Sequence, residues 1–259
     1  MCVARHLDSG ACVRFHSRME AHVPEPAEKP IPRIVPALLS FTAGFVDACT
    51  FLALFGLFVA QVTGSFVVVG AEFVTHDEGV LIKVLAIPVF FGAGLLTTIF
   101  AELLRRRGRR ALAWTLGVEC ALLAAFLVLG LVAPFRHEPN APATIAAALL
   151  GLSAMGVQSA AVRLLMPGVA STNVMTTNTT LFAIDAGELL LGWHGRRKSA
   201  AAAAQYAAAR QRLSVLVPIG IGFIVGSIAG AFGYVWFGLW CLTLILAALI
   251  GVIVWAARR

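Results

Sequence analysis

Residues 34–65 read IVPALLSFTAGFVDACTFLALFGLFVAQVTGS. An α-helix of about 20 apolar residues spans the ~30 Å hydrocarbon core of a bilayer. The first part of this stretch has that length and composition, yet it carries Asp47 near its middle, and the stretch ends in the polar tripeptide 63–65. We therefore expect a membrane helix followed by a segment that departs from helical geometry.

The whole chain has the composition of a membrane protein. Its 259 residues are 59% hydrophobic and 13% charged, with a mean hydropathy of +0.88, whereas soluble domains are about 45–50% apolar and about 25% charged. Too few polar residues remain to cover a water-exposed globule. The composition excludes a secreted disulfide scaffold, a disordered chain and an ordinary soluble enzyme, and it predicts a polytopic protein whose first partner is the lipid bilayer.

Eight apolar segments follow from the same criterion. They lie near residues 34–55, 57–74, 81–103, 111–133, 143–165, 169–191, 213–233 and 235–257. If all eight crossed the membrane, the five-arginine linker at 105–110 would fall outside, although cytoplasmic loops tend to retain Lys and Arg. The second and sixth segments are the most polar, so we expect neither to cross: each enters and leaves on the same side, and the two enter from opposite faces of the membrane. This leaves six transmembrane helices, with both termini cytoplasmic.

The first 33 residues differ from the rest of the chain. They are polar, contain four prolines between residues 24 and 32, and lack the apolar core of a cleavable signal. We expect 1–33 to be a disordered cytoplasmic tail and 34–259 to be one transmembrane domain, with Met19 as an alternative start. The tail also holds four zinc-competent side chains, namely Cys2, His6, Cys12 and His16, but their spacing is not that of a usual zinc finger. We predict no metal site and no cofactor.

The two halves of the transmembrane domain, about 34–133 and 143–257, share a weak internal repeat. At an offset of 112 or 113 residues the matching pairs are Gly44 with Gly156, Thr63 with Thr176, and Glu72 with Asp185. Three spans in each half would orient the halves oppositely, as in many transporters. The predicted fold class is an all-α polytopic membrane protein, with six transmembrane helices and two broken or re-entrant polar segments in a 3+3 inverted repeat.

The polar segments supply the candidate binding residues. Backbone that leaves helical geometry inside a bilayer needs polar partners or a water-filled cavity. The candidates for binding a small solute at mid-membrane are Asp47, Gln61, Thr63, Gly64, Ser65, Gln158, Ser159, Thr176, Thr177 and Asn178. Small and hydroxylated residues also line ordinary helix interfaces, so helix packing is the alternative interpretation.

Two acidic residues lie within predicted spans. Asp47 is near the centre of the first span, where a charge costs about 2.5–3.5 kcal/mol on insertion scales. Glu119 is shallower, in the segment 111–133. Both are candidates for coupling proton movement to transport, and a structural hydrogen bond to a neighbouring helix is the alternative role for Asp47.

Four short stretches resemble a known family. They are GFVDA at 44–48, FVAQVTGS at 58–65, GVQSAAVR at 156–163 and TNVMTTNTT at 172–180. Over about residues 35–257 the chain resembles the YoaK family of bacterial inner-membrane proteins. The resemblance implies a six-helix protein of the bacterial inner membrane. That family has no assigned function, so the resemblance supplies a topology and no reaction.

These features favour a transporter or channel for a small, unidentified solute, with a mid-membrane site formed jointly by the two broken segments and Asp47. The alternative is a non-transporting scaffold or partner-binding subunit that uses an alanine-rich helix over 199–209. No enzyme is predicted and no catalytic residue can be named, because the H-E-x-x-H, G-x-S-x-G, P-loop and Rossmann patterns do not occur. The five scattered cysteines imply no disulfide framework. Basic residues flank the apolar runs, which argues against a nucleic-acid partner, and glycines between 220 and 230 leave a homo-oligomer open.

Overall fold

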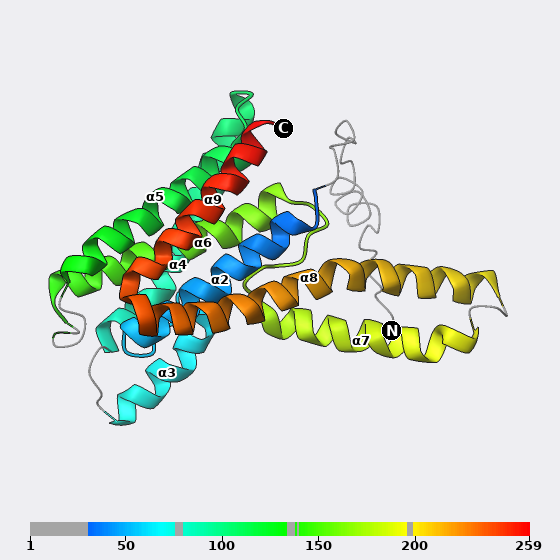
Figure 1. Cartoon of the computed structure of the whole chain (residues 1–259), viewed down its shortest axis with the longest axis horizontal. Coiled ribbons are helices and arrows are strands. Elements are labelled where there is room, and N and C mark those ends of the chain that lie inside the picture. The colour runs from blue at the N-terminus through cyan, green and yellow to red at the C-terminus, as the bar shows by residue number, and fades with distance from the viewer. Residues whose placement is uncertain (1–30, 76–79, 134–137, 139, 196–198) are drawn as a thin grey trace, which may run out of the picture. The chain divides into compact units, whose positions relative to one another are not determined.

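All regular secondary structure in the described part of the chain is helical. The structure, a computed structural model, describes residues 31–75, 80–133, 138, 140–195 and 199–259, and Pro32–Arg259 form one compact unit. The helices are α2 (Ile34–Ala53), α3 (Val62–Thr75), α4 (Val80–Arg106), α5 (Ala111–Val132), α6 (Pro142–Leu165), α7 (Met175–Gly195), α8 (Ala200–Phe237), η1 (Gly238–Cys241) and α9 (Leu242–Ala257) (Figure 1). The predicted all-α class is confirmed for these residues.

Within the described residues, five helical stretches are long and apolar enough to cross a membrane. They are Ile34–Ala53, Leu81–Arg106, Ala111–Val132, Pro142–Leu165 and the 58-residue stretch Ala200–Ala257. The last stretch contains both α8 and α9, joined by η1. α3 is apolar but shorter over Val62–Ala71. These lengths and compositions are those of a membrane-integral helical protein.

Both halves begin with a helix that is followed by irregular backbone. Residues 54–61 separate α2 from α3, and residues 166–174 separate α6 from α7. The irregular part occupies only the beginning of each predicted polar segment. Thr63 and Thr176 were expected within the broken backbone, but each is the second residue of a helix. The reason is that a first helical turn accommodates Thr and Ser readily, since its N–H groups have no partner within the helix.

α8 joins two elements that the sequence predicted as separate. An alanine-rich helix over 199–209 and a span from about residue 213 were expected, whereas α8 runs without a break from Ala200 over 38 residues, a length of about 57 Å. Ser199 caps the helix, because its hydroxyl oxygen accepts a hydrogen bond from the backbone N–H of Ala202 at 3.1 Å. The alanines that follow favour helix strongly, so the alanine-rich segment and the apolar span form one continuous helix.

Glycines bring two helix pairs into close contact. On α8, a row at four-residue spacing faces carbonyl groups of α2: Gly222 faces Ala37, Gly226 faces Phe41 and Gly230 faces Phe45. A Cβ at any of these glycines would overlap the facing carbonyl oxygen, so α2 and α8 approach as closely as small residues permit. α4 packs along α6 in a similar way, where Gly156 meets the backbone of Phe90.

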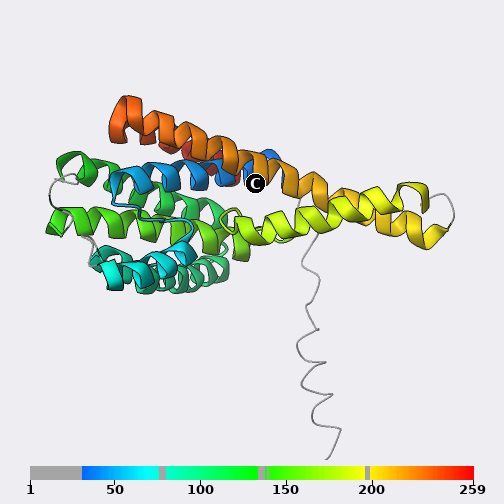
Figure 2. The same cartoon turned by 90° about the horizontal axis from the view of Figure 1, so that it is seen from below.

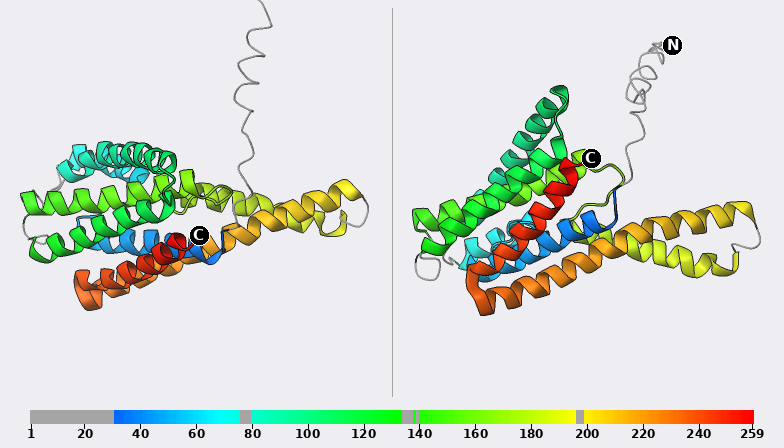
Figure 3. Two further views of the ribbon diagram at one scale, coloured as in Figure 1. Left: turned by 90° about the horizontal axis from the view of Figure 1, so that it is seen from above. Right: turned by 45° about the horizontal axis from the view of Figure 1, so that its top comes forward.

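α7 and the first half of α8 form a hairpin that extends away from the other helices (Figure 2, Figure 3). Arg212 of α8 donates to Oδ1 of Asp185 through Nε at 2.8 Å and Nη2 at 2.6 Å. Its Nη2 also donates to Glu188 at 3.0 Å. Farther along the hairpin, the rings of Trp193 and Tyr206 pack with their centroids 6.4 Å apart. These side-chain contacts hold α7 against α8.

Candidate functional site

The first broken segment turns the chain back along α2. Beyond the end of α2, Phe55 and Gly56 have φ values of 54° and 79°. This left-handed geometry is open to glycine and strained for phenylalanine. The Thr50 hydroxyl supports the turn, because it donates to the carbonyl oxygen of Leu57 at 3.4 Å. The chain then runs beside α2 toward Asp47.

Asp47 holds this segment in place. Its Oδ1 accepts hydrogen bonds from the backbone N–H groups of Val59 and Ala60, both at 2.8 Å. α3 begins two residues later, at Val62. The carboxylate therefore lies just ahead of the N-terminus of α3, where the helix dipole favours a negative group. The structural hydrogen bond considered for Asp47 is present, with the broken segment as its partner and not a neighbouring helix.

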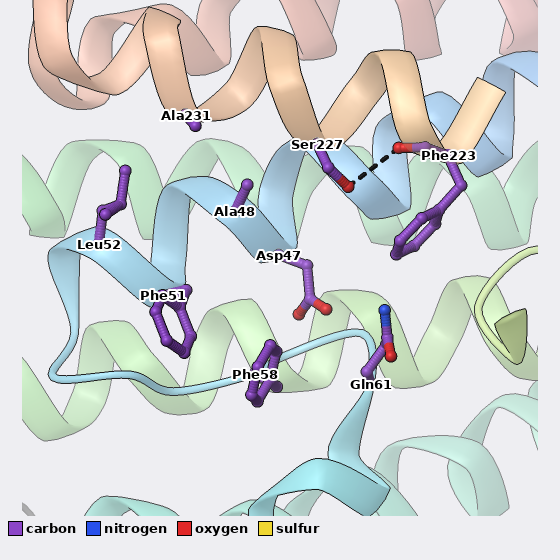
Figure 4. A pocket seen from close by; sticks show the side chains of 9 residues that line it. All are labelled: Asp47, Ala48, Phe51, Leu52, Phe58, Gln61, Phe223, Ser227 and Ala231. Carbon is purple, nitrogen blue, oxygen red and sulfur yellow. Dashed lines mark hydrogen bonds between the residues drawn. The ribbon is translucent and has the colours of Figure 1, made fainter. Parts of the chain in front are cut away.

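A cavity of about 310 Å³ lies beside the Asp47 carboxylate, between α2, the first broken segment and α8 (Figure 4). We call it the Asp47 cavity; its polar lining consists of Asp47, Gln61 and Ser227, and its apolar lining of Ala48, Phe51, Leu52, Phe58, Phe223 and Ala231. The Ser227 hydroxyl donates to the carbonyl of Phe223 at 2.9 Å. The wall of the cavity is thus mainly apolar, with three aromatic rings, and the buried Asp47 carboxylate lies at its edge together with the Gln61 amide.

The second broken segment is held by Gln158 of α6, which is fully buried. Its Nε2 lies within donor distance of the Leu39 carbonyl at 2.9 Å, of Thr172 Oγ1 at 3.1 Å and of Asn173 Oδ1 at 3.3 Å. The Thr172 hydroxyl donates in turn to Asn173 Oδ1 at 2.8 Å. Oε1 of Gln158 has no hydrogen-bond partner among the described residues. This network, the Gln158 network, ties residues 166–174 to both α6 and α2.

Two further side chains extend the Gln158 network. The hydroxyl of Ser40 in α2 lies 2.8 Å from the Ile219 carbonyl of α8 and 3.2 Å from the Thr172 carbonyl. At the start of α7, Nδ2 of Asn178 donates to the carbonyl of Ser171 at 2.6 Å. The polar groups of the second segment are therefore occupied mainly by the protein's own backbone and by one another.

The ten predicted binding residues fall into three groups. Asp47 and Gln61 line the Asp47 cavity, and Gln158 and Asn178 belong to the Gln158 network. The remaining candidates belong to neither group: Thr63, Thr176 and Thr177 are exposed, Gly64 and Ser159 are half-buried, and Ser65 is buried with a hydroxyl that has no partner in the described part of the chain. The Asp47 cavity takes its lining from the first half of the chain and from α8, and none of it from residues 166–174.

Four contributors to these groups were absent from the predicted site. They are Ser40, Thr172, Asn173 and Ser227. Ser40 had a readable signal, because it lies seven residues before Asp47 and two helical turns place both on one face. The partners of Asp47 had none, since Val59 and Ala60 contribute only backbone N–H groups, which side-chain patterns do not reveal.

Glu119 lies apart from both groups. It is fully buried in α5, and neither carboxylate oxygen has a hydrogen-bond partner among the described residues. α5 packs against α6 and α9. A carboxyl group inside a bundle of apolar helices is costly in its charged form, so Glu119 remains a candidate proton carrier on grounds separate from the Asp47 cavity.

Among the described residues, no group of three or more His, Cys, Asp and Glu side chains could hold a metal ion. The four zinc-competent residues Cys2, His6, Cys12 and His16 lie outside the described residues, so the zinc alternative stays a sequence-based hypothesis.

Comparison with known proteins identifies a family and assigns no activity. The family model described as Protein of unknown function (DUF1275) matches residues 35–255, and YoaK, which the sequence resembles, is a member of it. No curated protein and no solved structure matches the chain. The family match includes Asp47, the cavity beside it and the Gln158 network. The chain therefore belongs to the DUF1275 family.

Proposed function

We propose that this protein transports a small organic solute across the membrane, with the Asp47 cavity as its binding site. The observation that carries the proposal is the first broken segment, which returns along α2 to Asp47 and leaves this carboxylate beside a cavity of about 310 Å³. Irregular backbone at membrane depth is tolerated where it is buried in protein or lines a cavity. Discontinuous helices of this kind form the substrate sites of many transporters.

The proposed topology has six transmembrane helices, namely α2, α4, α5, α6, α8 and α9. α3 and α7 are then the helical parts of two re-entrant segments. In this arrangement, the helix ends next to three basic groups fall on one side of the membrane: Arg33, the linker 105–110, and the pair Arg258 and Arg259. Basic groups on one side are expected for cytoplasmic loops and termini. The resemblance to YoaK points to the bacterial inner membrane.

Matching contacts support a 3+3 inverted repeat. α3 begins at Val62 and α7 at Met175, the same offset that relates Thr63 to Thr176. Gly44 of α2 packs against the backbone of α8, and Gly156 of α6 packs against the backbone of α4. The first helix of each half thus contacts the third helix of the other half. Reciprocal contacts of this kind are expected when two oppositely oriented halves pack against each other.

The lining of the Asp47 cavity suggests the class of solute. The rings of Phe51, Phe58 and Phe223 favour an apolar body, and aromatic faces also attract cations. The Asp47 carboxylate favours a positive charge or a hydrogen-bond donor. We therefore infer that the solute is a small organic amine with an apolar part. Proton coupling would involve Asp47, with Glu119 as the second candidate.

A panel of small organic amines and their uncharged isosteres tests this proposal. An amine that binds is expected to raise the Tm of the purified protein by several degrees and to exchange across proteoliposomes. Asp47→Asn should abolish both effects, and Thr63→Ala should retain them because Thr63 is exposed outside the cavity. The proposal fails if no amine raises the Tm, or if the effect persists in the Asp47→Asn variant.

A second candidate function is that of a partner-binding membrane subunit, and the α7–α8 hairpin favours it. Leu190 and Leu191 are 78% and 86% exposed, and Trp193 is 54% exposed. If a protein partner covers this face, the double substitution Leu190→Ser and Leu191→Ser should remove a stoichiometric co-purifying protein. Leu96→Ser is the control, since Leu96 is 67% exposed on α4. Equal retention of the partner in both variants would exclude the hairpin as its site.

A further inference from the structure

Two cysteines from distant parts of the chain meet inside the bundle. Cys49 lies in α2 and Cys241 in η1, and their Sγ atoms are 3.8 Å apart although 192 positions separate them in sequence. Both side chains are buried. The third cysteine in the described residues, Cys120 of α5, is partly exposed. Scattered positions in the sequence therefore concealed a close thiol pair.

Rigid backbone fixes the position of this pair. Gly238, with φ of 57°, starts the turn that reverses the chain from α8 into α9. A Cβ added at Gly233 would lie 3.0 Å from the Cβ of Cys241, so α8 packs closely against the thiol. A disulfide has an S–S distance of about 2.05 Å, and the two sulfurs must therefore approach by about 1.8 Å. Side-chain rotation can supply a movement of that size.

The two thiols differ in access. Cys241 lines a cavity of about 520 Å³, whose wall includes Phe232, Trp236 and Trp240. Cys49 has no exposed surface and lies behind Cys241. A reagent entering this cavity would therefore reach Cys241 first.

We propose that Cys49 and Cys241 are a redox site that forms an intramolecular disulfide, which links α2 to the turn between α8 and α9. The oxidant is a disulfide or diazene reagent small enough to enter the cavity. With a disulfide R–S–S–R, the Cys241 thiolate attacks one sulfur and releases R–S⁻. The Cys49 thiolate then attacks Cys241 Sγ and releases the second R–S⁻. The two thiol protons pass to the released thiolates, so two cysteine thiols are oxidised and R–S–S–R is reduced to two R–SH.

The location of the pair is compatible with oxidation. Cys49 lies about 22 Å along α2 from Ile34, and Cys241 precedes α9, whose far end adjoins Arg258 and Arg259. Both thiols are thus near the helix ends opposite the basic clusters. In the proposed topology those ends face the outside, where disulfides persist. The proposal goes beyond transport and does not depend on any solute.

The test counts free thiols in membranes that contain the full chain with Cys2→Ser, Cys12→Ser and Cys120→Ser. After treatment with diamide, and separately with copper phenanthroline, the membranes are dissolved in SDS and reacted with a polyethylene-glycol maleimide. Reduced protein should gain two adducts. Oxidised protein should gain none, should remain monomeric on a non-reducing gel, and should yield a Cys49–Cys241 cross-linked peptide by mass spectrometry.

Single substitutions provide the matched control. Adding Cys49→Ser or Cys241→Ser to the same background should leave one adduct before and after either oxidant. The proposal is overturned if the two-cysteine protein keeps two adducts after both oxidants, or if the thiols are lost only through dimers between chains. Neither result would bear on amine exchange through the Asp47 cavity, so failure here is distinct from failure of the transport proposal.

Discussion

The two broken segments solve the same problem with different chemistry. At the first segment, the carboxylate of Asp47 in α2 accepts hydrogen bonds from the backbone N–H groups of Val59 and Ala60. At the second, the side-chain amide of Gln158 in α6 lies within donor distance of a carbonyl of α2 and of two side chains of the segment. The first segment borders a cavity of about 310 Å³. At the second segment, the Ser40 hydroxyl instead lies between the Thr172 carbonyl and the Ile219 carbonyl of α8.

This difference assigns separate roles to the two segments. The Asp47 carboxylate lies beside a cavity, so it can bind a solute in addition to the backbone N–H groups of the first segment. The Gln158 network is neutral and its donors are occupied by carbonyl and side-chain groups of the protein, so it mainly fixes the helices relative to one another. We therefore expect substitutions in the first segment to affect both stability and solute binding, and substitutions in the second to affect stability alone.

The largest expected effect comes from Asp47→Leu. This change leaves the N–H groups of Val59 and Ala60 without an acceptor, and each unsatisfied buried donor costs about 1–3 kcal/mol. We expect a loss of about 2–6 kcal/mol in the free energy of unfolding, measured by SDS titration of the protein in mixed micelles. Asp47→Asn keeps an acceptor oxygen and should lose clearly less. Equal stability of the two variants would mean that Asp47 does not hold the segment.

Gln158→Leu should have the next largest effect. The change removes a donor shared among Leu39, Thr172 and Asn173, but Thr172 and Asn173 remain bonded to each other. We expect a loss of about 1–2 kcal/mol in the same titration, with no change in amine exchange. If the variant keeps its stability but loses amine exchange, the solute site must include the second segment.

Asn178→Ala removes one hydrogen bond, the one that Nδ2 donates to the Ser171 carbonyl at 2.6 Å. The loss in local stability should be about 1 kcal/mol. It is measured as faster amide hydrogen exchange at the start of α7. The same measurement at the start of α3 is the internal control. Increased exchange at both places would indicate coupling between the two segments that this account does not include.

Thr63→Ala should have the smallest effect. Thr63 is an exposed residue in the first turn of α3, so the change in free energy of unfolding should stay within about 0.5 kcal/mol. Amine-dependent stabilisation should also be unchanged. A large loss of either property would show that the solute site extends from the cavity into α3.

The sequence predicted the helices well because length and hydropathy determine a membrane helix. The apolar segment 111–133 corresponds to α5 at Ala111–Val132, and 143–165 to α6 at Pro142–Leu165. The alanine-rich helix over 199–209 and the span from about residue 213 were predicted as separate elements, but α8 joins them without a break. Helix propensity indicates the first and membrane hydropathy the second, and neither signal shows that the two are continuous.

The site was predictable only in part. Asp47, Gln61 and Gln158 are conspicuous because they are polar within apolar stretches, and all three take part in the observed groups. Their partners are largely backbone atoms or residues far away in sequence. Tertiary packing alone determines that Gln158 reaches Leu39, 119 positions away, and that Cys49 meets Cys241. No local pattern encodes such contacts.

The most direct measurement compares thiol reactivity at the two segments in the membrane. Gln61→Cys and Thr172→Cys are introduced separately into a cysteine-free chain, and intact cells are treated with the small cationic reagent methanethiosulfonate-ethylammonium. The account predicts that the cysteine at 61 reacts, that a bound amine slows this reaction, and that the cysteine at 172 stays unreactive. Reaction at 172 with none at 61 would contradict the assignment of the solute site to the Asp47 cavity.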